Sequence, residues 1–171
     1  MNAIINISGY KTELLLDIYT NDRIVEAIDS QSPGYIPGEP DSLLYRNIFP
    51  FLRVPFTQNI ADTYVLVSVD VDRVSRGNRA YAKYHTTMWS LAHLDRMEMP
   101  RKYGATRIDY IAEELVEVFH GQRKFGFSEF ELISNREVLL DTKYLYRELV
   151  FTCDDLREPV GLGVTRNERR T

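Results

Sequence analysis

Residues 67–85, VSVDVDRVSRGNRAYAKYH, decide the fold that the sequence predicts. The stretch begins with alternating apolar and polar side chains: Val67, Ser68, Val69, Asp70, Val71 and Asp72. This period of two is typical of a strand with one buried face. Three arginines then surround a turn at Gly77 and Asn78. These arginines are Arg73, Arg76 and Arg79. We therefore predict a long β-hairpin with strands over 63–73 and 79–94 and an arginine-rich tip.

The second strand of this hairpin carries apolar side chains on both faces. One face receives Tyr84, Met88 and Ala92, and the other receives Tyr81, Trp89 and Leu91. A strand that is covered on both sides along part of its length has this pattern.

Composition and charge indicate an ordinary globular domain. The chain has 171 residues, of which 44% are hydrophobic and 27% are charged. The net charge of -4 and the pI near 5.4 argue against a dedicated nucleic-acid binder, which is usually basic. No apolar run approaches the roughly 20 residues that span a bilayer, and the opening residues lack the pattern of a signal peptide. We expect a soluble protein made in a cytoplasm.

Two segments are predicted to be helical. Apolar residues recur at helical spacing over 11–29, where the polar residues at 20–22 favour a break with one of them as an N-cap. The clearer helix covers 106–121, begins at the N-cap Thr106 and ends at Gly121. We interpret its acidic residues as a face in contact with solvent: Glu113, Glu114 and Glu117.

The remaining segments are a loop, a proline-containing run and a second hairpin. The loop at 30–42 contains Tyr35 and Ile36, whose apolar side chains suggest that it packs on something. The run IFPFLRVPF, residues 48–56, is at best an edge strand because proline cannot donate to a ladder. The runs 127–134 and 144–153 are strand-like and are joined by a polar segment around 135–143.

Together these segments predict an α+β fold. The order helix, hairpin, helix, hairpin favours a mainly antiparallel sheet of four to five strands, with two or three helices on one face and an extended hairpin arm. We expect one domain over residues 1–156. Residues 157–171 are then a C-terminal tail that is flexible or becomes ordered on a partner.

The sequence contains few candidates for catalytic or metal-binding residues. Asp70 and Asp72 are spaced to point to the same side of a strand and could hold Mg²⁺, but that side is also where a half-buried strand places solvated residues. The three histidines lack metal-ligand spacing: His85, His93 and His120. Cys153, the single cysteine, lies in a strand-like run and is interpreted as a small buried residue. There is no nucleophile elbow, P-loop or dinucleotide fingerprint. We predict no catalytic residues, metal or cofactor.

The arginine-rich tip has two interpretations. In the first, it is a hairpin end that charge keeps soluble. In the second, its guanidinium groups pair with carboxylates on a neighbouring subunit of this acidic protein. The candidate subunit or partner interface therefore consists of the tip and two loop residues: Arg73, Arg76, Gly77, Asn78, Arg79, Tyr35 and Ile36.

The order of segments over residues 10–156 resembles that of the tail terminators of tailed bacteriophages, which cap the tail tube or join it to the neck. The segments that carry this likeness are LLLDIYTNDRIVEAI (14–28), IFPFLRVPF (48–56), HTTMWSLAHLDRM (85–97), YGATRIDYIAEELVEVFHG (103–121), GFSEFELISN (126–135) and YLYRELVFTCDDL (144–156). The resemblance implies an α+β sandwich that forms a ring, commonly a hexamer. The loop at 30–42 departs from that pattern.

The resemblance also implies partners and a location. The partners would be further copies of the chain, the tail tube protein and neck or connector proteins, with no membrane, no cofactor and no sequence-specific nucleic acid, although DNA passes through the ring. The location would be the tail–neck junction of a virion assembled in the host cytoplasm. Three alternatives stay open at this point: a head-side connector, a small metal-dependent hydrolase that uses Asp70 and Asp72, and a generic adaptor.

Overall fold

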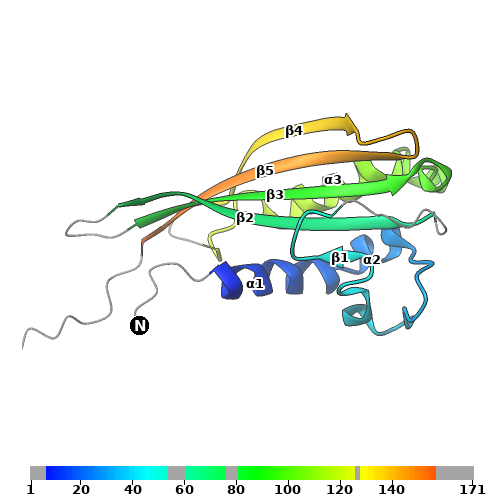
Figure 1. Ribbon diagram of the computed structural model, residues 1–171, viewed down its shortest axis with the longest axis horizontal. Coiled ribbons are helices and arrows are strands. Elements are labelled where there is room, and N and C mark those ends of the chain that lie inside the picture. The colour runs from blue at the N-terminus through cyan, green and yellow to red at the C-terminus, as the bar shows by residue number, and fades with distance from the viewer. Residues whose placement is uncertain (1–6, 54–60, 76–80, 126–127, 157–171) are drawn as a thin grey trace, which may run out of the picture.

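One sheet with helices on one side organises the chain (Figure 1). The computed structural model describes residues 7–53, 61–75, 81–125 and 128–156. The helices are α1 (Ile7–Tyr19), α2 (Asp22–Ile28) and α3 (Arg107–Phe119), with short 3-10 turns η1 (Pro40–Leu43), η2 (Leu94–Arg96) and η3 (Arg101–Tyr103). The strands are β1 (Ile48–Phe49), β2 (Thr63–Ser75), β3 (Tyr81–His93), β4 (Glu131–Leu139) and β5 (Tyr144–Leu156).

The strands form a single mixed sheet in the order β1-β2-β3-β5-β4. Three of the four pairings are antiparallel, and β1 pairs in parallel with β2 at the edge. Pro50 follows β1 directly, as expected for a short edge strand. The predicted α+β fold with its mainly antiparallel sheet is confirmed.

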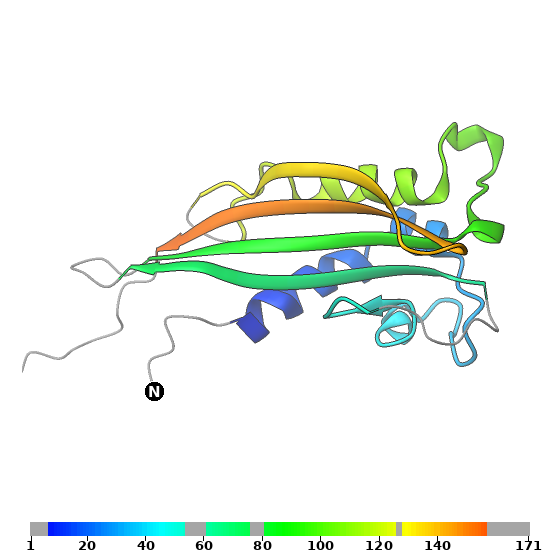
Figure 2. The same ribbon diagram turned by 45° about the horizontal axis from the view of Figure 1, so that its top comes forward.

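The alternation of valines on β2 buries one face against the helices. Val65, Val67 and Val69 are buried in the main core, together with Leu14 of α1 and Leu115 of α3. The strands lie in front of the helices in Figure 2. The period of two in the sequence therefore set which face of the sheet the helices cover.

The opposite face of the sheet has a smaller cluster of its own. Phe49, Leu66, Leu91 and Tyr144 are buried there, and the ring of Trp89 stacks on Tyr146 at 4.2 Å between centroids. The prediction that β3 is covered on both faces is confirmed. The large aromatic side chains of this cluster cover the apolar residues on the face of the sheet that the helices leave open.

The helix boundaries follow capping residues. Asn21 Oδ1 accepts the backbone N–H groups of Arg23 and Ile24, at 3.0 and 3.1 Å, and so starts α2 after the break that the sequence predicts. Thr106 caps α3 through the Asp109 N–H. Helix α1 begins at Ile7, four residues earlier than the pattern indicated.

Two expectations are wrong in detail. Strand β4 runs to Leu139, so only residues 140–143 turn the hairpin, because the polar residues of β4 lie on an exposed edge strand. Glu114 is buried rather than in contact with solvent, and its carboxylate lies 2.6 Å from the guanidinium of Arg23 on α2. A sequence pattern within α3 could not reveal this because the partner comes from another helix.

Candidate functional site

Three strands extend beyond the rest of the sheet and form an arm (Figure 1). Strand β4 makes its last pairing where Glu131 lies opposite Thr152. Past that point β2, β3 and β5 continue together until Ser75 pairs with Tyr81, and Tyr81 with Leu156. We call residues 71–75, 81–84 and 153–156 the arm. The predicted hairpin arm is thus a three-stranded projection, because β5 supports β3 along its whole length.

The arm places the predicted tip at its end. Arg73 belongs to β2 and pairs in register with Lys83. The other tip residues lie outside the described residues: Arg76, Gly77, Asn78 and Arg79. Lys83 in turn pairs with Asp154 of β5, so two basic residues and one acidic residue lie at neighbouring positions across the arm.

The aspartate pair lies where the pairing of β2 with β3 becomes irregular. Asp70 is exposed and lies opposite His85. The pairing of β2 with β3 shifts between Val71 and Arg73, so Asp72 occupies a bulge and the alternation on which the prediction relied is interrupted there. No group of three or more potential ligands that could hold a metal ion occurs among the described residues.

The loop residues predicted to pack behave differently from one another. Tyr35 is half-buried and packs on the main core, whereas Ile36 leaves 48% of its surface exposed. Arg46 closes the loop by donating to the carbonyl oxygens of Ser42 and Pro33, at 2.8 and 3.4 Å. Tyr45 beside it is 65% exposed and has φ of 59°, which is unusual for a bulky side chain. Nothing in the sequence pattern singled out Tyr45.

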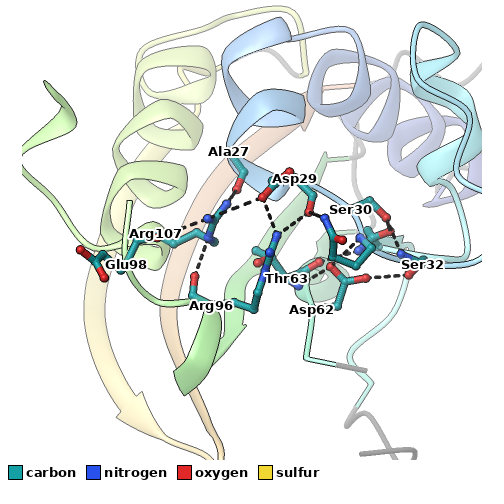
Figure 3. A network of polar contacts seen from close by, with 11 residues as sticks. Ala27, Asp29, Ser30, Ser32, Asp62, Thr63, Arg96, Glu98 and Arg107 are labelled. Atoms are coloured by element: carbon teal, nitrogen blue, oxygen red, sulfur yellow. Dashed lines mark hydrogen bonds and ion pairs between the residues drawn. The ribbon is translucent and has the colours of Figure 1, made fainter. Parts of the chain in front are cut away.

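A network of polar contacts joins the end of α2 to the start of α3 (Figure 3). Asp29 has φ of 46°, a left-handed conformation that Asp tolerates, and its Oδ2 lies 2.6 Å from the Arg96 guanidinium. Arg107 donates to the backbone carbonyls of Arg96, Glu98 and Ala27. Burial lowers the pKa of Arg107 from its ordinary value.

Asp62 forms the other half of this network. The residue is fully buried, and its carboxylate accepts the N–H of Thr63 at 2.8 Å, the hydroxyl of Ser32 at 2.7 Å and the N–H of Gln31 at 3.4 Å. The carboxylates and guanidinium groups of this network all make contacts within the chain: Asp29, Asp62, Arg96 and Arg107. We call the network a structural clamp, because it holds the loop after α2.

Other candidate chemical groups also have structural partners. Nδ1 of His93 accepts the Asp95 N–H at 3.1 Å, and the His93 ring stands edge-on to Tyr144. Cys153 is buried, as expected, and its Sγ lies 3.2 Å from the hydroxyl of Tyr10. Burial raises the pKa of Tyr10 from its ordinary value.

Comparison with known proteins places the chain in a family. A family model described as YomW matches residues 12–153, most of the chain. The chain belongs to the YomW family. No curated protein matches it.

The fold of this YomW-family chain also occurs in a solved structure. A chain from the structure described as the virion of a native gene transfer agent particle is similar, with a TM-score of 0.57 and 12% sequence identity. The similarity covers 88% of the YomW-family chain and 98% of that chain. At this identity the likeness establishes a shared fold.

An open hollow of about 690 Å³ lies at the base of the arm, and its lining mixes both charges: Lys83, His120, Arg123, Glu129, Glu131 and Asp154. Within the described ranges, no helix is both long and apolar enough to span a membrane.

Proposed function

We propose that this YomW-family chain is a structural protein of a virion of the tailed-bacteriophage type. In this proposal, copies of the chain form a ring that caps the tail tube and joins it to the neck, as a tail terminator does. The fold shared with almost the whole of a gene transfer agent virion chain is the observation that carries the proposal. The segment order over residues 10–156, read from the sequence, supports the same role.

The arm gives the ring a contact element. It extends past β4, ends at the arginine-rich tip and belongs to a chain with a net charge of -4. Guanidinium groups at such a tip form bidentate pairs with carboxylates of a neighbouring subunit or of the tube. Contacts of this kind set the register of an assembly and weaken with salt.

The proposed role is non-catalytic and needs no cofactor. The hydrolase alternative required Asp70 and Asp72 to act together, and the bulge at Asp72 speaks against it. Titration with Mg²⁺ or Mn²⁺ followed by calorimetry tests that alternative directly. Saturable binding that disappears in Asp70→Asn would favour the hydrolase over the structural role.

Solution mass is the first test of the ring. Light scattering of the purified chain over a range of protein and salt concentrations should detect a species of about six times 19.9 kDa that dissociates as salt rises. A chain that stays monomeric at all concentrations, and also when mixed with isolated tail tubes, would contradict the proposal.

Electron microscopy of particles assembled without this protein separates the terminator from a head-side connector. A terminator is expected to control tail length, so its loss should give tails of irregular length. Normal tails beside filled, tailless heads would instead favour the connector.

A further inference from the structure

The outer edge of β4 has free backbone hydrogen-bonding groups at alternate residues. Leu140 donates its N–H to the carbonyl of Tyr144 at 3.0 Å, which fixes the phase of the β4–β5 ladder. In an antiparallel pair, every second residue bonds inward and the residues between them face away. Residues 134, 136 and 138 therefore bond to β5, and Asn135, Glu137 and Leu139 direct N–H and C=O outward. Strand β4 is the last strand of the sheet (Figure 1).

The charged side chains along 135–139 make ion pairs with β5. Charged side chains on an edge normally discourage pairing with another strand. Here Arg136 turns back to Glu148 of β5, with a separation of 2.6 Å, and Arg147 of β5 binds Asn135 at 3.0 Å and Glu137 at 3.5 Å. These contacts direct the charged groups of Arg136 and Glu137 toward β5, whereas the ladder directs the N–H and C=O groups of alternate residues outward.

A different kind of protection is present at the start of β4. Nδ1 of His120 accepts the N–H of Leu132 at 3.2 Å, and the pairing with β5 shifts between Leu132 and Ser134. Ile133 at this bulge and Leu139 at the far end are both exposed apolar side chains. The stretch 135–139 is thus a regular strand edge that ends at the exposed Leu139, with the exposed Ile133 two residues before its start.

The sequence contains a segment suited to this edge. Residues 159–164 read PVGLGV, in which Val160, Leu162 and Val164 alternate with two glycines. This alternation is that of a strand with one apolar face, and glycine on the other face permits close approach. Residues 157–171 contain four arginines and two glutamates, whereas 128–143 contain four acidic and two basic residues. The charges of the two segments are complementary.

The geometry points to a second copy of the chain as the donor. Asn135 pairs with Leu149, seven residues before Leu156 on β5, a distance of about 23 Å along the strand. Val160 follows Leu156 by only four residues, which reach about 14 Å even when fully extended. The tail of the same chain therefore cannot lay residues 160–164 beside 135–139.

We propose that residues 160–164 of one copy add a strand to the free edge of β4 in the next copy, at residues 135–139. Such a contact is head-to-tail, so repetition of it closes a ring when the rotation permits. This inference rests on the proposed self-association and names one of its contacts.

Hydrogen exchange of the full-length protein tests this contact residue by residue. The amides of Asn135, Glu137 and Leu139 should exchange at least about tenfold more slowly in concentrated than in dilute protein. The amides of Arg136 and Val138, which bond inward, are internal references and should stay protected at both concentrations. In Leu162→Asp the concentration dependence of the three outward amides should disappear.

A proline variant with a matched control tests the edge itself. Glu137→Pro removes the outward N–H without removing a ladder hydrogen bond, and Glu137→Ala removes only the side chain. We expect Glu137→Pro to abolish the slowed exchange at Asn135 and Leu139, and Glu137→Ala to retain it. Unchanged thermal unfolding of the dilute variants verifies that the fold is intact.

The outcomes separate this inference from the proposed ring. Equal exchange of the three amides at all concentrations, in samples whose mass is that of a ring, would overturn the tail contact and leave the ring standing. Slow exchange that persists in Leu162→Asp would assign the edge to another occupant. A monomeric mass with fast exchange at every concentration contradicts both proposals.

Discussion

At the scale of single residues, the buried charged side chains of the described ranges make ion pairs or hydrogen bonds within the chain. Glu114 of α3 is buried beside the exposed guanidinium of Arg23, and Asp62 is surrounded by three donors. A buried carboxylate without such partners is strongly unfavourable. Removing the partner of Glu114 leaves a buried carboxylate without its cation, whereas removing Asp62 leaves buried donors without their acceptor.

The Glu114–Arg23 pair predicts a pH-dependent effect. Burial raises the pKa of Glu114 and the neighbouring Arg23 lowers it, with burial the larger cause. Because the folded-state pKa lies above that of the unfolded chain, ionisation of Glu114 reduces stability as the pH rises through this window. Arg23→Ala should therefore lower the urea midpoint more at pH 7 than at pH 4, where Glu114 is protonated. Equal losses at both pH values would contradict the assignment. Arg123→Ala, from the exposed pair with Glu129, is the control.

Asp62 predicts a loss of stability through its hydrogen bonds. Asp62→Ala leaves the N–H of Thr63 and the hydroxyl of Ser32 without their acceptor in a buried environment. We expect the free energy of unfolding to fall by about 2–3 kcal/mol, the typical cost of losing hydrogen bonds to a buried charge. Urea denaturation measures it, with the exposed Glu13→Ala as the control. A change below about 0.5 kcal/mol would show that the clamp is not needed.

At the scale of elements, local sequence determines where helices start, and pairing partners determine where strands stop. Asn21 and Thr106 occupy the N-cap positions of α2 and α3. By contrast, β4 continues through polar residues to Leu139 because β5 lies beside it. A helix cap is a local interaction, whereas a strand end depends on a distant neighbour.

The N-cap of α2 predicts a moderate contribution of Asn21 to the free energy of unfolding. Asn21→Ala removes the acceptor for the N–H groups of Arg23 and Ile24, so we expect a loss of about 1 kcal/mol in the free energy of unfolding. Thr20→Ala is the matched control, since the Thr20 hydroxyl only donates back to Leu16 on the exposed surface. If the two variants unfold at the same urea concentration, Asn21 does not act as a cap that contributes to stability.

At the scale of the whole molecule, the sheet has one face under the helices and two features that extend outward, the arm and the edge of β4. The base of the arm still packs on α1, because Tyr84 and Cys153 are buried against Tyr10, whereas the edge of β4 lies at the far side of the sheet. The arrangement suits a protein that acts through surfaces shared with its neighbours.

The arm predicts a separation between stability and assembly. Changing Arg73, Arg76 and Arg79 together to Gln should leave thermal unfolding of the dilute protein unchanged and raise, by at least about tenfold, the concentration at which the ring-sized species forms. The control changes three arginines elsewhere, which alters the net charge equally: Arg53, Arg101 and Arg123. Light scattering compares the two. Equal weakening in both variants would attribute the effect to net charge rather than to the tip.

Much of the fold was predictable because its signals are local. The valine alternation of β2 indicated the hairpin and its buried face, and the apolar spacing after Thr106 indicated α3. The break between α1 and α2 followed from the cap at Asn21. The interface residues at the hairpin tip stay a prediction, and of the two loop residues only Tyr35 packs as expected.

The sequence by itself therefore determined most of the elements, their order and the buried side of β2, since these depend on side chains a few residues apart. Only the tertiary structure decided which residues far apart in the chain become partners. It buried Glu114 beside Arg23, extended β4 along β5, and paired β1 in parallel with β2. The physical reason is that burial, pairing and free edges are properties of neighbours in space, and those neighbours are set only when the whole chain has folded.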